Sequence, residues 1–255
     1  MSSSSYKLFF VDLDGTLIGS DSKISPRVSR AVARVSGILH VAIATGRERA
    51  DVIRFARELG LSTPQLSDGG AMILDPVAGT AIWSSPLGPA RAREILDRLG
   101  GLEVSFIATH PQGTFTSIAE ITHWDVIRIS ALDLDQRMAD QLIADYEGEP
   151  GVDAVKAYLP YNGLWAADFT RSGVNKAAAA RTLAGMMGVE TSQMIAAGDS
   201  YNDLPLLQAC RLRIAMADAP DELKAIADFI APTADEDGLA IAIEEFVLPR
   251  LEEGG

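Results

Sequence analysis

Apolar strand-like runs alternate with amphipathic helix-like runs at both ends of this 255-residue chain, and no other feature constrains the fold as tightly. The runs that read as strands are residues 7–13, 38–45, 194–200, 211–217 and 228–233, with a short strand and turn at 64–74. Those that read as helices are 26–37, 47–60, 174–188, 202–210, 219–227 and 236–248. Ser25 and Pro26 give the first helix an N-cap and a proline at its first position. Strands separated by helices are typical of βαβ units. The sequence therefore predicts an α/β fold, a doubly wound parallel sheet with helices on both faces.

Residues 83–169 have a different pattern, in which a helix-like run is followed by strand-like runs, twice over. The helix-like runs are 89–100 and 135–148, and the strand-like runs are 103–109, 114–120, 124–130, 152–159 and 164–170. The last two strands are joined by a Pro160-Tyr161-Asn162-Gly163 turn, and Asn-Gly is a strong hairpin signal. We therefore expect an α+β domain at 83–169, inserted into a core made of residues 1–82 and 170–255.

Charge and cysteine content limit the partners and the compartment. The formal net charge is -13, so nucleic acid and anionic membranes are not expected partners. A single cysteine, Cys210, excludes an intramolecular disulfide and suits a reducing cytoplasm. The start, MSSSSYK, lacks the apolar stretch of a signal peptide, and no run approaches the length of a membrane helix. We expect a cytoplasmic protein, and the sequence leaves monomer and homodimer both open.

Polar residues and one glycine gather where the predicted parallel strands end. They are Asp12, Asp14, Thr45, Gly46, Arg47, Asp199, Asn202 and Asp203, together with Lys176 at the start of a predicted helix. The carboxyl ends of parallel strands form the sites of such sheets, so these side chains should converge on one edge. Carboxylate oxygens are the ligands that Mg²⁺ prefers, which predicts a magnesium site shared by Asp12, Asp14 and Asp199.

Four segments in this order resemble the motifs of the haloacid dehalogenase-like phosphatases. They are residues 12–17 (DLDGTL), 45–47 (TGR), Lys176, and 198–203 (GDSYND). The insert between the second and third motifs is where this family places its type C2 cap domain. The nearest subgroup is the Cof-type sugar phosphatases, whose core is a Rossmann-like sheet. One departure is residues 67–71, Ser-Asp-Gly-Gly-Ala, where the subgroup usually has Asn-Gly-Ala.

The resemblance implies a role for each motif residue. Asp12 is expected to attack phosphorus and form an aspartyl-phosphate, and Asp14 to act as general acid and base. Thr45, Gly46 and Lys176 are expected to hold the phosphoryl oxygens.

The remaining motif residues are expected to serve the metal or the fold. Asp199 is an expected Mg²⁺ ligand, joined by the backbone carbonyl of Asp14. Asp203 is expected to act through water or to orient Lys176. For Asn202, a phosphate contact and a plain helix N-cap are equally open, and Arg47 is either functional or structural.

The expected function is a Mg²⁺-dependent phosphatase acting on the phosphomonoester of a small metabolite, such as a sugar phosphate. Phosphoglycolate phosphatase and phosphomutase remain alternatives on the same core, and phosphate release would separate the mutase. A dehalogenase needs neither a leaving-group acid nor a metal, which argues against that chemistry. No Gly-x-Gly-x-x-Gly follows the first strand, which argues against a dinucleotide-binding module. A silent regulatory relative would be expected to have lost its nucleophile or a metal ligand, and neither is lost.

The strand-like run 152–159 gives a prediction about specificity. Alternation would turn Val155, Ala157 and Leu159 toward the helices of the inserted domain. Lys156 and Tyr158 would then point from the open face of its sheet, where caps of this type meet the substrate. A solvated strand face is the competing interpretation.

Overall fold

The computed structural model describes residues 6–159 and 162–253. The first five residues, part of the segment without a signal-peptide pattern, and Pro160 and Tyr161 of the predicted turn lie outside this range. The chain divides into two compact units, Met1–Gly79 with Asn175–Gly255 and Thr80–Val174. Each unit is described by itself below.

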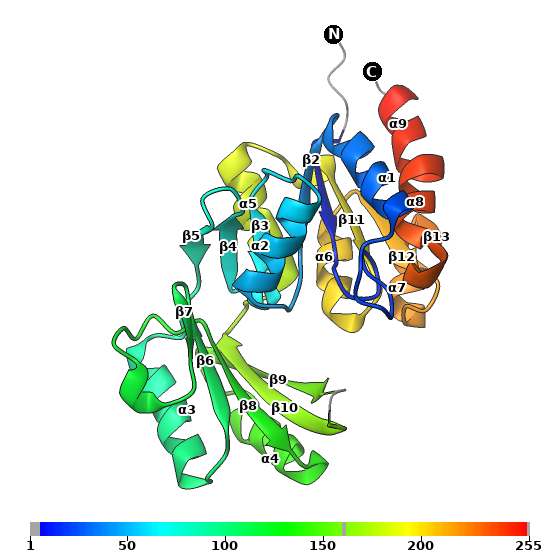
Figure 1. Ribbon diagram of the computed structural model, residues 1–255. Coiled ribbons are helices and arrows are strands. Elements are labelled where there is room, and N and C mark those ends of the chain that lie inside the picture. Colours follow the sequence, from blue (N-terminus) through cyan, green and yellow to red (C-terminus); the bar gives the residue numbers. More distant parts are fainter. Residues whose placement is uncertain (1–5, 160–161, 254–255) are drawn as a thin grey trace. The chain divides into compact units, whose positions relative to one another are not determined.

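Five parallel strands form the sheet of the first unit, in the order β13-β12-β11-β1-β2 (Figure 1). They are β1 (Leu8–Val11), β2 (His40–Ile43), β11 (Met194–Gly198), β12 (Leu212–Met216) and β13 (Phe229–Ala231). β1 lies between β11 and β2, and Val11 stands opposite Ala197 and Ile43. The carboxyl ends of these three strands therefore meet at one edge of the sheet.

Helices pack around this sheet, and both of its faces are buried. The helices are α1 (Pro26–Ser36), α2 (Arg49–Glu58), α5 (Lys176–Met187), α6 (Leu204–Ala209), α7 (Asp221–Ile226), α8 (Gly238–Ala242) and α9 (Leu248–Glu253), with a π-helical turn at Ile243–Val247 between the last two. Phe9 and Val11 face a core that includes α1 and α8, helices from opposite ends of the chain that lie side by side (Figure 1). Leu8 and Phe10 point to the other face and are also fully buried. Apolar runs buried on both faces are characteristic of parallel sheets, and the predicted fold class is confirmed.

Local signals set the start of α1 as predicted. The Ser25 hydroxyl accepts a hydrogen bond from the backbone N–H of Val28 at 3.1 Å, and Pro26 occupies the first helical position. A short antiparallel pair, β3 (Gln65–Ser67) and β4 (Met72–Asp75), follows α2. These two strands are joined by a 3₁₀ turn at Asp68–Gly70.

The second unit carries an antiparallel sheet in the order β7-β6-β8-β10-β9. The elements of this unit are β5 (Thr80–Ser84), α3 (Pro89–Gly101), β6 (Phe106–His110), β7 (Gly113–Phe115), β8 (Arg128–Leu134), α4 (Gln136–Tyr146), β9 (Val152–Leu159) and β10 (Leu164–Arg171). Leu96 of α3, Leu142 of α4 and Phe169 of β10 belong to one apolar core. β9 and β10 form the hairpin that the Asn162-Gly163 signal predicts.

Two predicted strands of this unit differ from those observed. The run 114–120 continues as a strand only to Phe115 and then forms a 3₁₀ turn at Ile118–Glu120. The run 124–130 forms a strand only from Arg128, and this strand extends to Leu134. Its bounds follow from partners distant in sequence, because Ala131 stands opposite both Phe106 and Ala167. Within the described ranges, no helix has the length and apolar character needed to cross a membrane.

Candidate active site

Hydrogen bonds of the sheet ladder continue past the end of β1 and hold Asp12 at the sheet edge. The Asp12 N–H donates to the Ala197 carbonyl at 3.0 Å, and the Ala44 N–H donates to the Val11 carbonyl at 2.9 Å. β1 ends at Val11, so strand alternation does not govern the directions of the side chains at residues 12–14. Asp12 is buried, whereas Asp14 is exposed.

Asp12, Asp199 and Asp203 form a compact group of carboxylates. One oxygen from each lies within 4.8 Å of the other two. Lys176 Nζ donates to Asp12 Oδ1 at 2.6 Å and to Asp203 Oδ1 at 2.7 Å, and all three of these residues are buried. Three carboxylates against one ammonium leave an excess of negative charge, and hard cations such as Mg²⁺ suit such an oxygen donor set.

The pKa shifts in this group reflect burial and crowding of like charges. Burial raises the pKa of Asp12 well above its usual value, and Asp203 and Asp199 add to this while Lys176 opposes it. Burial, followed by Asp203, raises the pKa of Asp199 to about 6. Burial would lower the pKa of Lys176, but Asp12 and Asp203 outweigh it and raise that pKa. A cation bound here would favour the ionised carboxylates.

The Asp199 carboxylate is positioned by the turn after β1. The Thr16 hydroxyl donates to Asp199 Oδ1 at 3.1 Å. Gly15 has φ of +77°, and a Cβ at this residue would lie 2.4 Å from Asp199 Oδ2. The glycine is therefore required for space as well as for backbone conformation, since the carboxylate lies directly against its Cα.

Asp203 links the end of β11 to the lysine. Its Oδ2 accepts from the backbone N–H groups of Asp199 and Ser200, at 3.2 and 3.1 Å, while its Oδ1 accepts from Lys176. Asn202 is not a helix cap, which corrects one of its two expected roles. It lies inside the 3₁₀ turn Tyr201–Asp203, Ser200 takes the cap position, and α6 begins only at Leu204.

Asp14 pairs with Arg47, a contact that the sequence did not predict. Arg47 Nε donates to Asp14 Oδ2 at 2.9 Å and Arg47 Nη2 to Asp14 Oδ1 at 2.6 Å. Arg47 Nη1 also donates to Asp51 of α2 at 3.2 Å. The Asp14 hydrogen bond is the main reason that the pKa of Arg47 is raised. Asp14 is thus held apart from the buried carboxylate group, with its side chain 55% exposed.

Thr45 and Gly46 follow β2, the neighbour of β1 on the other side. Thr45 is buried, and its hydroxyl accepts from the backbone N–H of Arg47 at 3.1 Å. The Thr45 carbonyl accepts from the Gly69 N–H at 3.0 Å. A Cβ at Gly46 would meet nothing within 4 Å, so open space adjoins this residue.

The expected orientation of Lys156 and Tyr158 is wrong. Lys156 forms an ion pair with Asp140 of α4 and lies over the Trp165 ring, so it points to the helix-covered face of its sheet. Tyr158 lies opposite Trp165 and shares that face, whereas Val155 on the other face is 60% exposed. The substrate role that rested on the opposite orientation loses its support.

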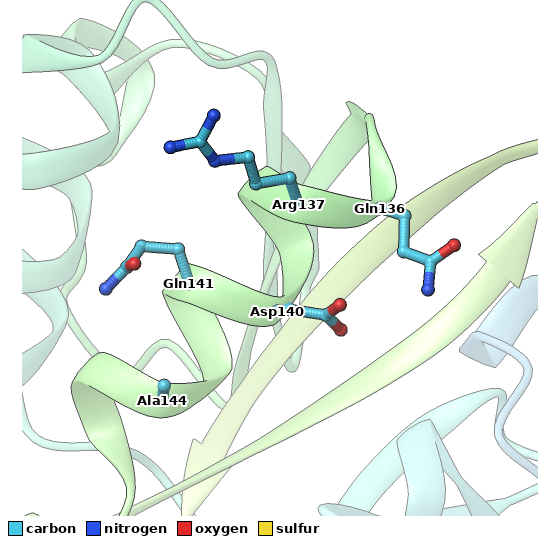
Figure 2. A pocket seen from close by; sticks show the side chains of 5 residues that line it. All are labelled: Gln136, Arg137, Asp140, Gln141 and Ala144. Atoms are coloured by element: carbon cyan, nitrogen blue, oxygen red, sulfur yellow. The ribbon is translucent and has the colours of Figure 1, made fainter.

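Two surface hollows lie away from these residues. One, of about 500 Å³, is lined by Gln136, Arg137, Asp140, Gln141 and Ala144, all from α4 (Figure 2). Another, of about 430 Å³, lies at the start of β2 and is lined in part by Leu39 and His40. Neither includes a predicted site residue. The catalytic candidates lie instead in the buried carboxylate group around Lys176.

Comparisons with known proteins find a matching family profile and several similar phosphatases. The family profile described as haloacid dehalogenase-like hydrolase matches residues 9–124 and 116–243. A phosphoglycolate phosphatase of Natronomonas pharaonis is 29% identical, over 92% of this chain and 95% of its own. The 5-amino-6-(5-phospho-D-ribitylamino)uracil phosphatase YitU of Bacillus subtilis is 26% identical, over 94% of this chain and 97% of its own. A solved sugar phosphatase of HAD subclass IIB superposes with a TM-score of 0.75 at 20% identity, over 94% of this chain and 99% of that one.

Proposed function

The chain belongs to the haloacid dehalogenase-like hydrolases and is a phosphoric monoester hydrolase of the Cof type, and from this premise we propose that it uses Mg²⁺ and an aspartyl-phosphate on Asp12 to hydrolyse a small phosphorylated metabolite. The observation that carries this proposal is the buried group of Asp12, Lys176, Asp199 and Asp203. An ordinary structural ion pair has no need of two further carboxylates, because each adds repulsion in a buried setting.

The proposed reaction begins with transfer of the phosphoryl group to Asp12. A carboxylate oxygen of Asp12 forms a bond to phosphorus, while the bond from phosphorus to the ester oxygen breaks. Asp14 donates its proton to the departing alkoxide. Lys176, held by Asp12 and Asp203, places its positive charge beside the transferred group, and Thr45 and Gly46 donate hydrogen bonds to its oxygens.

Hydrolysis of the aspartyl-phosphate completes the proposed cycle. Asp14, now ionised, takes a proton from water as the water oxygen attacks phosphorus. The bond to Asp12 breaks, and phosphate leaves. Mg²⁺, when held by Asp12, Asp199 and the Asp14 carbonyl, with Asp203 in support, supplies the charge that offsets repulsion between carboxylate and phosphoryl group.

We propose the inserted unit, which the sequence bounds at residues 83–169, as the cap that selects the substrate. A sugar phosphate is our first choice, supported by the Cof-type resemblance and by the sugar phosphatase of similar fold. Phosphoglycolate is the second choice, supported by the relative from Natronomonas pharaonis that carries this name. A screen of phosphate release over sugar phosphates, phosphoglycolate and nucleotides, with and without Mg²⁺, distinguishes them. Turnover without free phosphate would indicate a phosphomutase instead.

Asp12→Asn tests the covalent step. The amide preserves shape but is a poor nucleophile, so we expect phosphate release to fall by at least about 10³-fold. The melting temperature at pH 8 should not fall, because the substitution removes a carboxylate whose pKa is raised by burial. Asp21→Asn, at an exposed aspartate in the same region, is the matched control and should retain full activity. Near-normal phosphate release by Asp12→Asn would contradict the mechanism.

A further inference from the structure

The turn at residues 67–71, which joins β3 to β4, has an unusual backbone. Three successive residues have positive φ: Asp68 at 52°, Gly69 at 67° and Gly70 at 99°. Ser67, Asp68 and Gly70 are buried, and the Ser67 hydroxyl donates to Asp68 Oδ2 at 2.9 Å. A tight, buried, left-handed turn of this kind has little freedom to move.

One side of the turn is hydrogen-bonded to the loop after β2. The Asp68 N–H donates to the Arg47 carbonyl at 2.9 Å, and the Gly69 N–H donates to the Thr45 carbonyl at 3.0 Å. The Thr45 N–H in turn donates to the Leu66 carbonyl at 3.3 Å. The position of Thr45 is therefore fixed to the turn through backbone contacts on both of its sides.

The other side of the turn lies against the start of α5. A Cβ at Gly70 would lie 2.4 Å from the Asn175 carbonyl oxygen, 2.6 Å from its carbonyl carbon and 3.0 Å from the Lys176 nitrogen. These are backbone atoms, so they cannot yield by a change of rotamer. Lys176 is the first residue of α5, and Asn175 caps the helix by accepting from the Ala178 N–H at 2.8 Å.

We propose that Gly70 is a positioning residue, which lets the turn act as a rigid spacer between Thr45 and Lys176. The inference rests on the proposed function, in which these two residues hold the same phosphoryl group. Lys176 Nζ lies 2.6 Å from Asp12 and 2.7 Å from Asp203, and a displaced helix start would change both distances. Displacement of a catalytic group by about 1 Å can lower a rate by roughly 10²-fold.

Gly69 provides the matched control. It also has positive φ, but a Cβ there would meet nothing within 4 Å. Alanine at either position is strained by the left-handed backbone, whereas only alanine at Gly70 pushes against α5. If the turn merely joins two strands, the two variants should differ only in stability.

The test compares Gly70→Ala and Gly69→Ala, each alone and combined with Lys176→Ala. Readouts are kcat for phosphate release, melting temperature, and affinity for inorganic phosphate with Mg²⁺ measured by calorimetry. We expect Gly70→Ala to lower kcat by about 10- to 100-fold and to weaken phosphate binding, while Gly69→Ala stays within about twofold of the wild type. In the Lys176→Ala background, Gly70→Ala should cause no further loss of phosphate affinity, because its effect acts through that lysine.

Several outcomes would overturn the inference: wild-type kcat in Gly70→Ala, equal losses in Gly70→Ala and Gly69→Ala, or phosphate-binding losses that add in the double variant. If Gly70→Ala does not fold, Asp68→Gly decides, because it loosens the spacer without a steric clash. We expect it to lower kcat several-fold with a retained melting transition, and an unchanged kcat would count against the spacer. A wild-type protein that releases phosphate from no substrate would contradict the proposed function, and the phosphate-binding cycle would still test the spacer.

Discussion

The guanidinium of Arg47 and the carboxylate of Asp14 meet through two hydrogen bonds, at 2.9 and 2.6 Å. Two-point pairs of this kind fix the plane and the direction of a carboxylate. Arg47 is itself held by Asp51 at the start of α2. We therefore infer that Arg47, a residue of the second motif, orients the proposed general acid.

Arg47→Ala should impair acid catalysis selectively. An alkyl leaving group needs a proton from Asp14, whereas p-nitrophenolate leaves with little assistance. We expect kcat/KM for an alkyl phosphate to fall about 10-fold and that for p-nitrophenyl phosphate to change little. Arg54→Ala is the matched control. Arg54 also pairs with Asp51, but within the described part of the chain it makes no hydrogen bond or ion pair with Asp14. Equal losses on both substrates would indicate damage to α2 rather than to acid catalysis.

Asp199 makes the effect of Mg²⁺ on stability dependent on pH. Its pKa in the folded protein, about 6, lies above the usual 3.8, so its contribution to stability is present at low pH and is lost as pH rises through 6. Bound Mg²⁺ offsets the repulsion between Asp199 and its neighbouring carboxylates only at pH values at which they are ionised. We expect the rise in melting temperature on adding Mg²⁺ to be larger at pH 8 than at pH 5. An equal rise at both pH values would exclude these carboxylates as the ligands.

His110 has the opposite dependence and must be separated from this measurement. Burial lowers the pKa of His110 below 6.5, so its contribution is present above that pH and is lost as pH falls. It lies in the inserted unit and is not among the proposed Mg²⁺ ligands, so we expect its contribution to be the same with and without Mg²⁺. The difference between the two melting temperatures therefore isolates the carboxylate group.

At the scale of the element, β9 shows that shifting the strand alternation by one residue changes which side chains face solvent. Val152 and Ala154 pack against the core, so Lys156 and Tyr158 share their face. Lys156→Ala removes the ion pair to Asp140 and the contact with the Trp165 ring. We expect a loss of about 0.5–1 kcal/mol in the free energy of unfolding, measured with urea, and unchanged KM for every substrate. A raised KM for the best substrate alone would restore the specificity role that its orientation now argues against.

The fold class was predictable because it depends on patterns within single segments. Strand and helix periodicity, the Ser25-Pro26 helix start and the Asn162-Gly163 turn are local signals, and the structure contains the elements they predict. Which face of β9 packs against the core was not predictable in this way. An exposed Val155 is as apolar as a buried one, and its face is set by pairing with β10 and by packing on α4.

The same distinction between local and distant information applies to the site. The motif residues Asp12, Lys176 and Asp199 could be named from the sequence because each lies at the end of a strand or the start of a helix. The pairing of Arg47 with Asp14 and the approach of Gly70 to Asn175 could not. These contacts join segments far apart in the chain, and neither glycine nor arginine carries a local sign of its partner.

At the scale of the whole molecule, each of the two units has an apolar core of its own. Phe9 and Val11 belong to one core, and Leu96, Leu142 and Phe169 belong to the other. A segment with its own core can fold alone if that core is large enough. We expect residues 80–174, expressed separately, to show a cooperative thermal transition by circular dichroism. A featureless melt would mean that the inserted unit depends on the rest of the chain.

Carboxylates and backbone that lie directly against glycine have a consequence for how the protein can vary. In a saturation mutagenesis screen selected for activity, Gly15 and Gly70 should tolerate as few replacements as Asp12, since any side chain would meet Asp199 or Asn175. The positions that tolerate no replacement would then outnumber the residues that touch substrate. Lineages descending from this protein should be able to exchange surface residues freely while these glycines stay fixed. Steric exclusion, as much as chemistry, would restrict their divergence.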